Sequence, residues 1–143
     1  MPIRKSSAEW QGNLNQGRGK MVVGNGSFEG AYSFGSRFEN SDGTNPEELI
    51  AAAHAGCFSM ALSHELDQEG YEPHRVSTEA VLELDKTDSG FTISTITLNC
   101  RAKISGINRD AFADIARLAK DNCPVSRALA GVTIKMNAEL EGQ

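Results

Sequence analysis

The sequence has few cysteines, and their number is odd. Three cysteines in 143 residues exclude the paired framework that holds small secreted domains together. No apolar run approaches the roughly 18 residues of a membrane span, and residues 1–13 lack the apolar segment of a signal peptide. Basic residues are also in deficit, 14 against 19 acidic ones, for a net charge of −5, which argues against nucleic acid or an anionic membrane as partner. We therefore expect a cytoplasmic globular protein with a single domain over residues 1–143.

The middle of the chain predicts a long buried helix. Asn45 is a good N-cap, Pro46 suits the first helical position, and Glu47 lies in the first turn, where the helix dipole favours an anion. Residues 49–62 leave almost no polar face, so the helix should be buried on all sides. From residue 46 to 69 it would be roughly 36 Å long. Because this is long for so small a domain, we expect a neighbouring chain to cover part of it.

The remaining segments alternate between strand and helix patterns. Glycine-punctuated short strands come first, and Gly24-Asn25-Gly26 has the spacing of a turn rather than of a phosphate-binding loop. Long alternating strands, a helix capped by Asn108, a short helix and a final strand follow the central helix. The predicted segments are strands at 8–10, 20–23, 32–34, 76–84, 91–104 and 132–140 and helices from 108 and at 125–130. This order predicts an α+β fold with antiparallel sheets around the long helix.

The three cysteines lie in different environments. Cys100 is on the apolar face of a strand and is expected to be core. Cys57 lies in the buried helix among small residues, and burial disfavours a thiolate unless a cation or donor compensates. His54, one helical turn away, and Arg37, outside the helix, could supply this cation or donor.

Cys123 stands directly before Pro124, at or beside a helix N-terminus, where free N–H groups stabilise a thiolate. This segment alone fits either a reactive thiol or a helix cap without chemistry. Cys57 and Cys123 are 66 positions apart, which excludes a local CxxC redox loop. Any bond between them would have to join segments brought together by the fold.

Taken alone, these residues are compatible with three classes of function. His54, Cys57 and His64 could chelate a metal on one helix face, although no fourth ligand is evident. A hydrolase with His54 as base to Cys57 would leave Cys123 without a part. A non-catalytic stress or ligand-binding protein is the third alternative.

Four sequence elements together resemble the OsmC/Ohr family, the osmotically inducible and organic hydroperoxide resistance proteins, and they favour the OsmC branch. The elements are GTNPEELI at residues 43–50, AHAGCFSMAL at 53–62, SRF at 36–38 and NCPVS at 122–126. The similarity covers nearly the whole chain. It implies an OsmC-like intertwined dimer and a thiol-dependent peroxidase that protects against oxidative or osmotic stress. The implied substrates are organic hydroperoxides and, less well, hydrogen peroxide.

The resemblance also implies the site residues. Cys57 matches the peroxidatic cysteine, Cys123 the resolving cysteine, and Arg37 and Glu47 the polar pair that activates Cys57. The Cys57 thiolate would attack the peroxide and become a sulfenic acid, and Cys123 would condense with it to a disulfide. A dithiol reductant, of lipoyl type in this family, would then reduce the disulfide. The resemblance implies no cofactor and no metal.

Helix geometry raises a question about this site. Glu47 and Cys57 are ten residues apart, or about 15 Å along a continuous helix. Either the helix breaks between them or Glu47 acts across a two-fold homodimer, and the absence of a polar helix face favours the dimer. Phe38, Phe58 and Met60 are expected either to line a pocket for alkyl or aryl hydroperoxides or to belong to the core.

Overall fold

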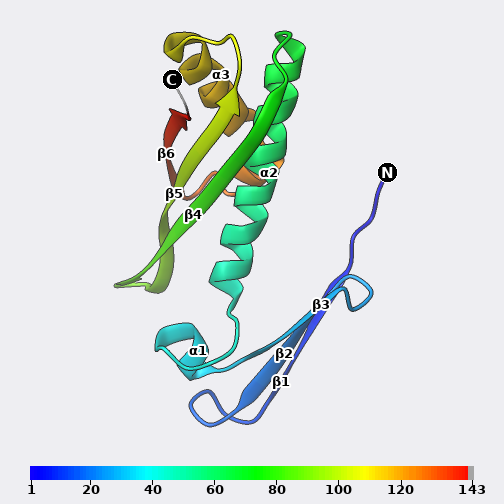
Figure 1. The fold of residues 1–143 in the computed structure, drawn as a ribbon. Helices are drawn as coiled ribbons and strands as arrows, with labels where there is room; N and C mark the ends of the chain where they lie inside the picture. Colours follow the sequence, from blue (N-terminus) through cyan, green and yellow to red (C-terminus); the bar gives the residue numbers. More distant parts are fainter. Residues whose placement is uncertain (142–143) are drawn as a thin grey trace. The chain divides into compact units, whose positions relative to one another are not determined.

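The computed structural model describes residues 1–141. By its internal contacts the chain divides into two compact units, Met1–Leu49 and the part from Ile50 onward. Figure 1 shows the elements of both units along the chain. No helix within residues 1–141 combines the length and apolar character needed to cross a membrane.

The first unit is an antiparallel sheet followed by a short helix. Its strands β1 (Ser6–Gln11), β2 (Arg18–Val23) and β3 (Phe28–Tyr32) pair in chain order. The β2–β3 connection has positive φ at Gly24 and Gly26, which confirms the predicted turn. Across the sheet the rings of Trp10 and Tyr32 lie 5.4 Å apart. They close over Gly19 so tightly that a Cβ there would collide with both rings.

The helix α1 (Phe34–Phe38) was not expected from the sequence, which predicted a strand over residues 32–34. A reciprocal cap starts this helix: Ser33 Oγ accepts from the Ser36 N–H, and Ser36 Oγ accepts from the Ser33 N–H. A five-residue helix is too short to show helical periodicity, so its cap is the only local signal. The consequence is that Arg37 lies on a helix rather than in an extended segment.

The second unit contains most of α2 (Pro46–Gln68) and a second sheet. Strands β4 (Pro73–Thr87), β5 (Gly90–Ile104) and β6 (Thr133–Leu140) follow one another in space. The helices α3 (Arg109–Asn122) and α4 (Pro124–Ala128) come between β5 and β6. Figure 1 shows this sheet alongside α2 and α3. The predicted α+β class and the long unbroken central helix are confirmed.

One strand direction differs from the expectation. β4 and β5 pair antiparallel as predicted, but β6 is parallel to β5. The physical reason is the connection: α3 and α4 form a helical crossover, which returns the chain to the sheet in its original direction. Strand alternation alone carries no information about direction, so the sequence pattern could not reveal this.

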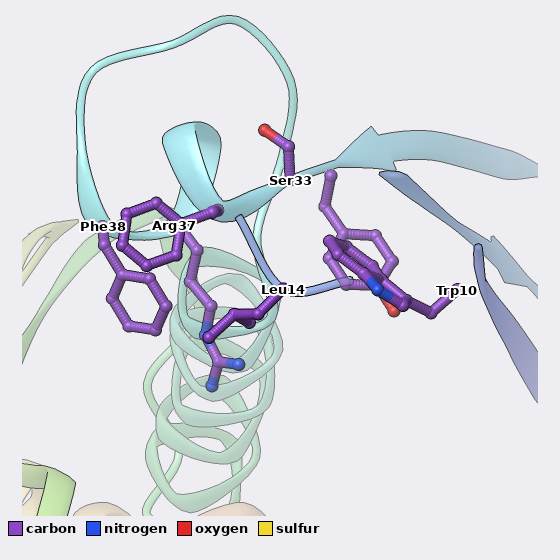
Figure 2. Close-up of a pocket in the computed structure, with 7 residues that line it drawn as sticks. Trp10, Leu14, Ser33, Arg37 and Phe38 are labelled. Atoms are coloured by element: carbon purple, nitrogen blue, oxygen red, sulfur yellow. The ribbon is translucent and has the colours of Figure 1, made fainter. Parts of the chain in front are cut away.

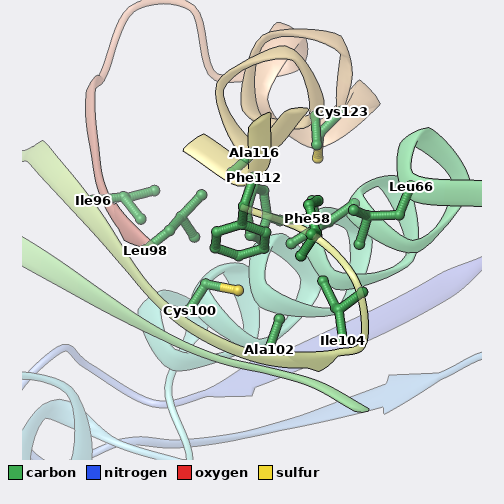
Figure 3. Packing of buried hydrophobic residues seen from close by; sticks show 13 residues of the cluster. Phe58, Leu66, Ile96, Leu98, Cys100, Ala102, Ile104, Phe112, Ala116 and Cys123 are labelled. Atoms are coloured by element: carbon green, nitrogen blue, oxygen red, sulfur yellow. The ribbon is translucent and has the colours of Figure 1, made fainter. Parts of the chain in front are cut away.

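The core of the second unit lies between the sheet and the helices (Figure 3). α2 contributes His54, Phe58, Leu62 and Leu66, a four-residue repeat that forms one buried stripe. On another face Met60 is 79% exposed. The single chain therefore buries one stripe of α2 and leaves other apolar side chains of the helix exposed. The prediction that α2 is buried on all sides is not met within one chain.

Candidate active site

Two cysteines far apart in sequence come together in the second unit. Cys57 lies on α2, and Cys123 lies at the junction where α3 ends and α4 begins. Their Sγ atoms are 2.9 Å apart, and both cysteines are free thiols. Cys123 is fully buried, whereas Cys57 is partly exposed. A reagent from solvent therefore meets Cys57 first and has Cys123 directly behind it.

Local sequence explains how Cys123 reaches this position. Its N–H donates to the Ala119 carbonyl, 2.9 Å away, and closes the last turn of α3. Pro124 then takes the first position of α4, where the missing N–H costs nothing. The extended ψ of 124° at Cys123 changes the chain direction between the two helices. The sequence prediction of a cysteine beside a helix N-terminus is thus confirmed.

The thiol of Cys57 is not activated by its neighbours within the second unit. Burial raises its pKa above the ordinary value, and Cys123 adds to the rise, first through the hydrogen bond between the two thiols and less through charge repulsion. The Val125 N–H donates to Cys57 and acts in the opposite direction, lowering the pKa. Among the described residues of this unit, no cation contributes to the shift. The Val125 N–H is thus the one stabilising contribution to a Cys57 thiolate among the causes found in the described part of this unit, and it does not outweigh burial.

Cys100 belongs to the core, as the sequence predicts. It is 1% exposed on β5, and Figure 3 shows it pointing into the same cluster as Leu98 and Phe112. Burial raises the pKa of its thiol, and a hydrogen bond with Thr78 only partly opposes the rise. Cys100 thus has neither the access nor the thiolate character of a reactive cysteine.

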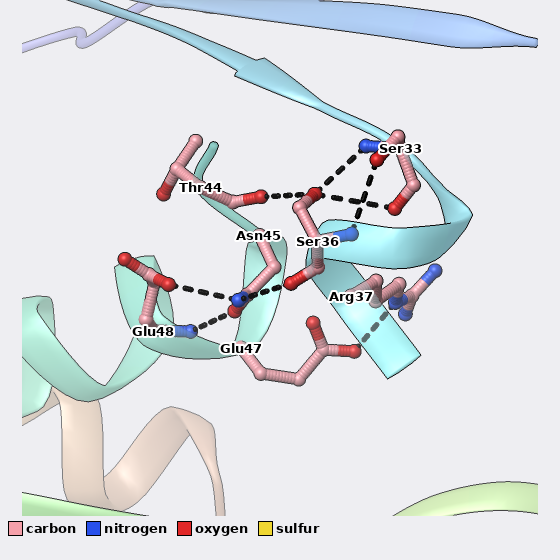
Figure 4. Close-up of polar contacts among 7 residues, drawn as sticks. All are labelled: Ser33, Ser36, Arg37, Thr44, Asn45, Glu47 and Glu48. Atoms are coloured by element: carbon pink, nitrogen blue, oxygen red, sulfur yellow. Dashed lines mark hydrogen bonds and ion pairs between the residues drawn. The ribbon is translucent and has the colours of Figure 1, made fainter. Parts of the chain in front are cut away.

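The first unit holds an ion pair between the other two candidate residues (Figure 4). Arg37, in the last turn of α1, donates from Nε to Oε1 of Glu47 at 2.6 Å. Glu47 is buried in the first turn of α2, and its second oxygen, Oε2, has no hydrogen-bond partner among residues 1–141. The Arg37 side chain remains 40% exposed. Glu47 thus fixes one edge of the guanidinium and leaves the remaining N–H groups available to a ligand.

Short hydrogen bonds hold the elements that carry this ion pair. Ser36 Oγ donates to the Thr44 carbonyl at 2.8 Å, and Asn45 Nδ2 donates to the Ser36 carbonyl at 3.1 Å. Asn45 Oδ1 also accepts from the Glu48 N–H, which caps α2 as the sequence predicts. The first two bonds tie Ser36 of α1 to the residues just before α2, so side chain–backbone hydrogen bonds fix the positions of Arg37 and Glu47.

A pocket of about 260 Å³ lies beside Arg37 in the first unit (Figure 2). Its walls are largely aromatic and aliphatic, with the guanidinium at one side. The lining residues are Trp10, Leu14, Tyr32, Ser33, Phe34, Arg37 and Phe38. Of the three residues considered for such a pocket, only Phe38 lines it: Phe58 is completely buried core and Met60 is exposed on α2.

The structure thus pairs the four predicted site residues as Cys57 with Cys123 and Arg37 with Glu47, one pair in each unit. α2 is continuous between Glu47 and Cys57, so the predicted alternative of a helix break does not occur.

The two histidines of the possible metal site, His54 and His64, lie in different environments. His54 is completely buried and bonded to Ser126, whereas His64 is exposed. Over residues 1–141 no group of three or more His, Cys, Asp or Glu side chains has an arrangement that could hold a metal ion.

Sequence reasoning missed the contacts that α4 makes with α2. The Val125 N–H reaches Cys57, and Ser126 Oγ lies 2.7 Å from Nε2 of His54. A serine three residues after Cys123 was the only available signal, and such a serine usually serves as a solvent-facing helix residue. These contacts exist only because the fold sets α4 against α2.

Comparison with known proteins decides the family. The model of the OsmC-like protein family matches residues 39–137. This chain belongs to the OsmC-like family. Peroxiredoxin OsmC of Escherichia coli is 44% identical over 127 residues, which cover 88% of this chain and 89% of that relative. The organic hydroperoxide resistance protein OhrB of Bacillus subtilis is 34% identical over 68% of this chain and 71% of its own length.

Solved structures show the same OsmC-like fold. The organic hydroperoxide resistance protein OsmC from Legionella pneumophila has a TM-score of 0.70 with 98% of each chain covered, at 23% identity. An organic hydroperoxide resistance protein from Elizabethkingia anophelis has a TM-score of 0.72 over 99% of each chain, also at 23% identity. The family and the OsmC-like chain fold predicted from the four sequence elements are confirmed, whereas the intertwined dimer stays a prediction.

Proposed function

We propose that this chain is a thiol-dependent peroxidase that reduces organic hydroperoxides to alcohols. The observation that carries the proposal is the Cys57–Cys123 pair, 2.9 Å apart with one thiol partly exposed and the other buried. Its OsmC-like relatives include proteins named for peroxiredoxin activity and for organic hydroperoxide resistance. The pair supplies what such a reaction needs, a first thiol open to the peroxide and a second one within reach.

The chemistry follows from this arrangement. The Cys57 thiolate attacks the distal oxygen of ROOH and becomes a sulfenic acid as the O–O bond breaks. The alkoxide RO⁻ leaves and takes up from solvent the proton that the thiol had released, giving ROH. The Cys123 sulfur then attacks the Cys57 sulfur, forming a disulfide and releasing water. A dithiol reduces this disulfide by thiol–disulfide exchange and returns both thiols.

Arg37 and Glu47 are proposed to activate Cys57 across a homodimer. Burial raises the pKa of Cys57, and no cation of its own unit opposes the rise. Glu47 is separated from Cys57 by ten residues of unbroken α2, about 15 Å, so it does not touch the Cys57 of its own chain. In a two-fold dimer, Arg37 of one chain would lie beside Cys57 of the other. The apolar surface that α2 leaves open, at Met60 for example, supports such an interface.

The dimer that we propose would use both units of each chain. We propose that they are parts of one OsmC-like domain over residues 1–143, completed when a second copy covers α2. Each active site would then draw a thiol pair from one chain and an ion pair from the other.

The pocket beside Arg37 supports a preference for organic hydroperoxides over hydrogen peroxide. Its walls offer Trp10, Leu14 and Phe34 to an alkyl or aryl group, and burying such a group gains about 25 cal/mol per Å² of apolar surface. Hydrogen peroxide has no apolar part to bury. The guanidinium at the edge of the pocket can hold the peroxide oxygens.

The reductant and the compartment are proposed from the same cycle. The proposed cycle must return Cys57 and Cys123 to free thiols after each turnover, and a reducing cytoplasm favours that state. The partly exposed Cys57 sulfur is the one that an incoming dithiol can attack, and a compact dithiol of lipoyl type suits this access. Protection against oxidative or osmotic stress is the physiological role we propose.

The direct test is consumption of cumene hydroperoxide with excess dithiol by the wild type, Cys57→Ser and Cys123→Ser. We expect no turnover from Cys57→Ser, and one rapid turnover followed by over-oxidation from Cys123→Ser. Mass spectrometry of the oxidised wild type should give a Cys57–Cys123 disulfide. Cys100→Ser is the matched control and should keep full turnover. Undiminished activity in Cys57→Ser would exclude the proposal.

A further inference from the structure

A buried histidine–serine hydrogen bond lies directly beside the cysteine pair. His54 is completely buried on α2, and its Nε2 lies 2.7 Å from Ser126 Oγ on α4. Ser126 is itself buried. The second ring nitrogen, Nδ1, is buried without a hydrogen-bond partner in the described part of the chain. Burying two polar side chains without a hydrogen bond between them would destabilise the fold. The bond therefore holds α2 and α4 in a fixed position relative to each other.

The ring is neutral, and its tautomer follows from the surroundings. Burial lowers the pKa of His54 below its ordinary value, so at neutral pH the ring carries one proton. With the proton on Nδ1, a buried donor would be left unpaired, which is rare in folded proteins. With the proton on Nε2, His54 donates to Ser126 Oγ and only an acceptor is left without a partner. The second arrangement is the less costly one.

The hydrogen bond lies one helical turn from each sulfur. His54 precedes Cys57 by three residues on α2, and Ser126 follows Cys123 by three residues. Between them, the Val125 N–H donates to the Cys57 sulfur. These are three polar contacts between α2 and the start of α4, at Cys123, Val125 and Ser126. Oxidation of Cys57 alters the first two directly, whereas His54 and Ser126 do not bond to a reacting sulfur.

We propose that the His54–Ser126 hydrogen bond positions Cys123 for attack on the Cys57 sulfenic acid, and so determines how often resolution precedes over-oxidation. The inference rests on the proposed peroxidase function and adds two positioning residues to it. Neither side chain touches the peroxide or takes part in bond exchange. Their contribution is to keep α4 seated while the sulfur of Cys57 carries an extra oxygen.

Two reactions compete for the sulfenic acid. In resolution, Cys57–SOH and Cys123–SH give the disulfide and water. In over-oxidation, Cys57–SOH and a second ROOH give the sulfinic acid and ROH. The first reaction is intramolecular and the second depends on the hydroperoxide concentration. At one hydroperoxide concentration, half of the sulfenic acid formed in a turnover is over-oxidised. This concentration measures the resolution rate relative to the over-oxidation rate constant.

The experiment compares Ser126→Ala with the wild type. Protein, cumene hydroperoxide at rising concentration and a fixed dithiol are incubated, and mass spectrometry gives the sulfinic acid fraction per turnover. We expect the half-over-oxidation concentration to fall about fivefold in Ser126→Ala, the effect of losing one typical buried hydrogen bond. The rate of the first oxidation, measured by stopped flow, should stay within about twofold of the wild type. His54→Gln keeps a donor near the position of Nε2, so this variant should retain the wild-type ratio of resolution to over-oxidation.

The outcomes separate this inference from the proposed function. If the wild type forms no Cys57–Cys123 disulfide, the proposed function fails. If the disulfide forms but Ser126→Ala has the wild-type partition, the positioning role is wrong. A lower yield of folded protein does not move the partition, because it is measured on each molecule that reacts. Should Ser126→Ala not fold, the comparison of His54→Phe with His54→Gln decides, and equal partition in both would overturn the inference.

Discussion

The position of Arg37 relative to Cys57 in the active enzyme can be tested by distributing two substitutions between chains. Glu47, which holds Arg37 at 2.6 Å, and Cys57 are ten residues apart on one continuous helix, or about 15 Å. If the active site is shared, each Cys57 depends on Arg37 of the partner chain. Heterodimers with two different tags, isolated by successive affinity steps, make this dependence measurable.

Two heterodimers with identical overall composition serve as the test and its control. In the first, one chain carries Arg37→Met and the other Cys57→Ser. In the second, one chain carries both substitutions and the other is wild type. For a shared site, the first heterodimer keeps one complete site and should show about half of the wild-type turnover per dimer. The second has no complete site and should fall about a hundredfold, as expected on loss of a key charged donor.

The assay is cumene hydroperoxide consumption with excess dithiol at pH 7, normalised to dimer concentration. Residues that act within their own chain would give the reverse result, with half activity in the second heterodimer and background in the first. That reversal, or a fully active monomer by sedimentation, would refute the reasoning from helix length.

Three further perturbations follow from the structure. Arg37→Gln should lower kcat/KM at pH 7 about a hundredfold. Because burial raises the pKa of Cys57, kcat/KM of this variant should still rise with pH in alkali, where the wild-type profile has levelled off. A pH profile parallel to that of the wild type would contradict this. Burial lowers the pKa of His54 in the folded state, so below about pH 6.5 the unfolded chain binds a proton that the folded chain does not. The free energy of unfolding should therefore be highest above pH 6.5 and fall below it, by at most about 1.4 kcal/mol per pH unit. Urea unfolding from pH 7.5 to 5.5 should show this slope in the wild type and a flatter profile in His54→Gln. Phe58→Ala, at a position with no exposed surface, should lower the free energy of unfolding by about 3–5 kcal/mol, whereas Cys100→Ala should cost about 1 kcal/mol and leave turnover unchanged.

Local sequence signals predicted the helices that carry Glu47, Cys57 and Cys123, but not α1, which carries Arg37. The cap at Asn45 and the unbroken apolar run up to Leu62 defined α2, and Asn108 marked the start of α3. The Cys123-Pro124 step placed a cysteine at a helix junction. Each of these signals acts within a few residues, where backbone hydrogen bonding decides the outcome.

Other features had no local signal. α1 is too short for periodicity, and the parallel direction of β6 depends on how the crossover helices pack. The contacts of His54 with Ser126 and of Val125 with Cys57 join segments about 70 residues apart. Periodicity could mark such residues as buried or helical, but it could not pair them.

By itself the sequence predicted which residues belong to the chemistry, through four elements that resemble the OsmC/Ohr family. Three of the four lie within residues 39–137, which the family model matches. The sequence also assigned Cys100 to the core, because its strand neighbours are apolar. The tertiary structure alone decided that Cys57 and Cys123 meet at 2.9 Å and that Arg37 pairs with Glu47. The reason is physical: a residue's type and its local helix or strand depend on near neighbours, whereas a contact between distant segments depends on how the whole core packs.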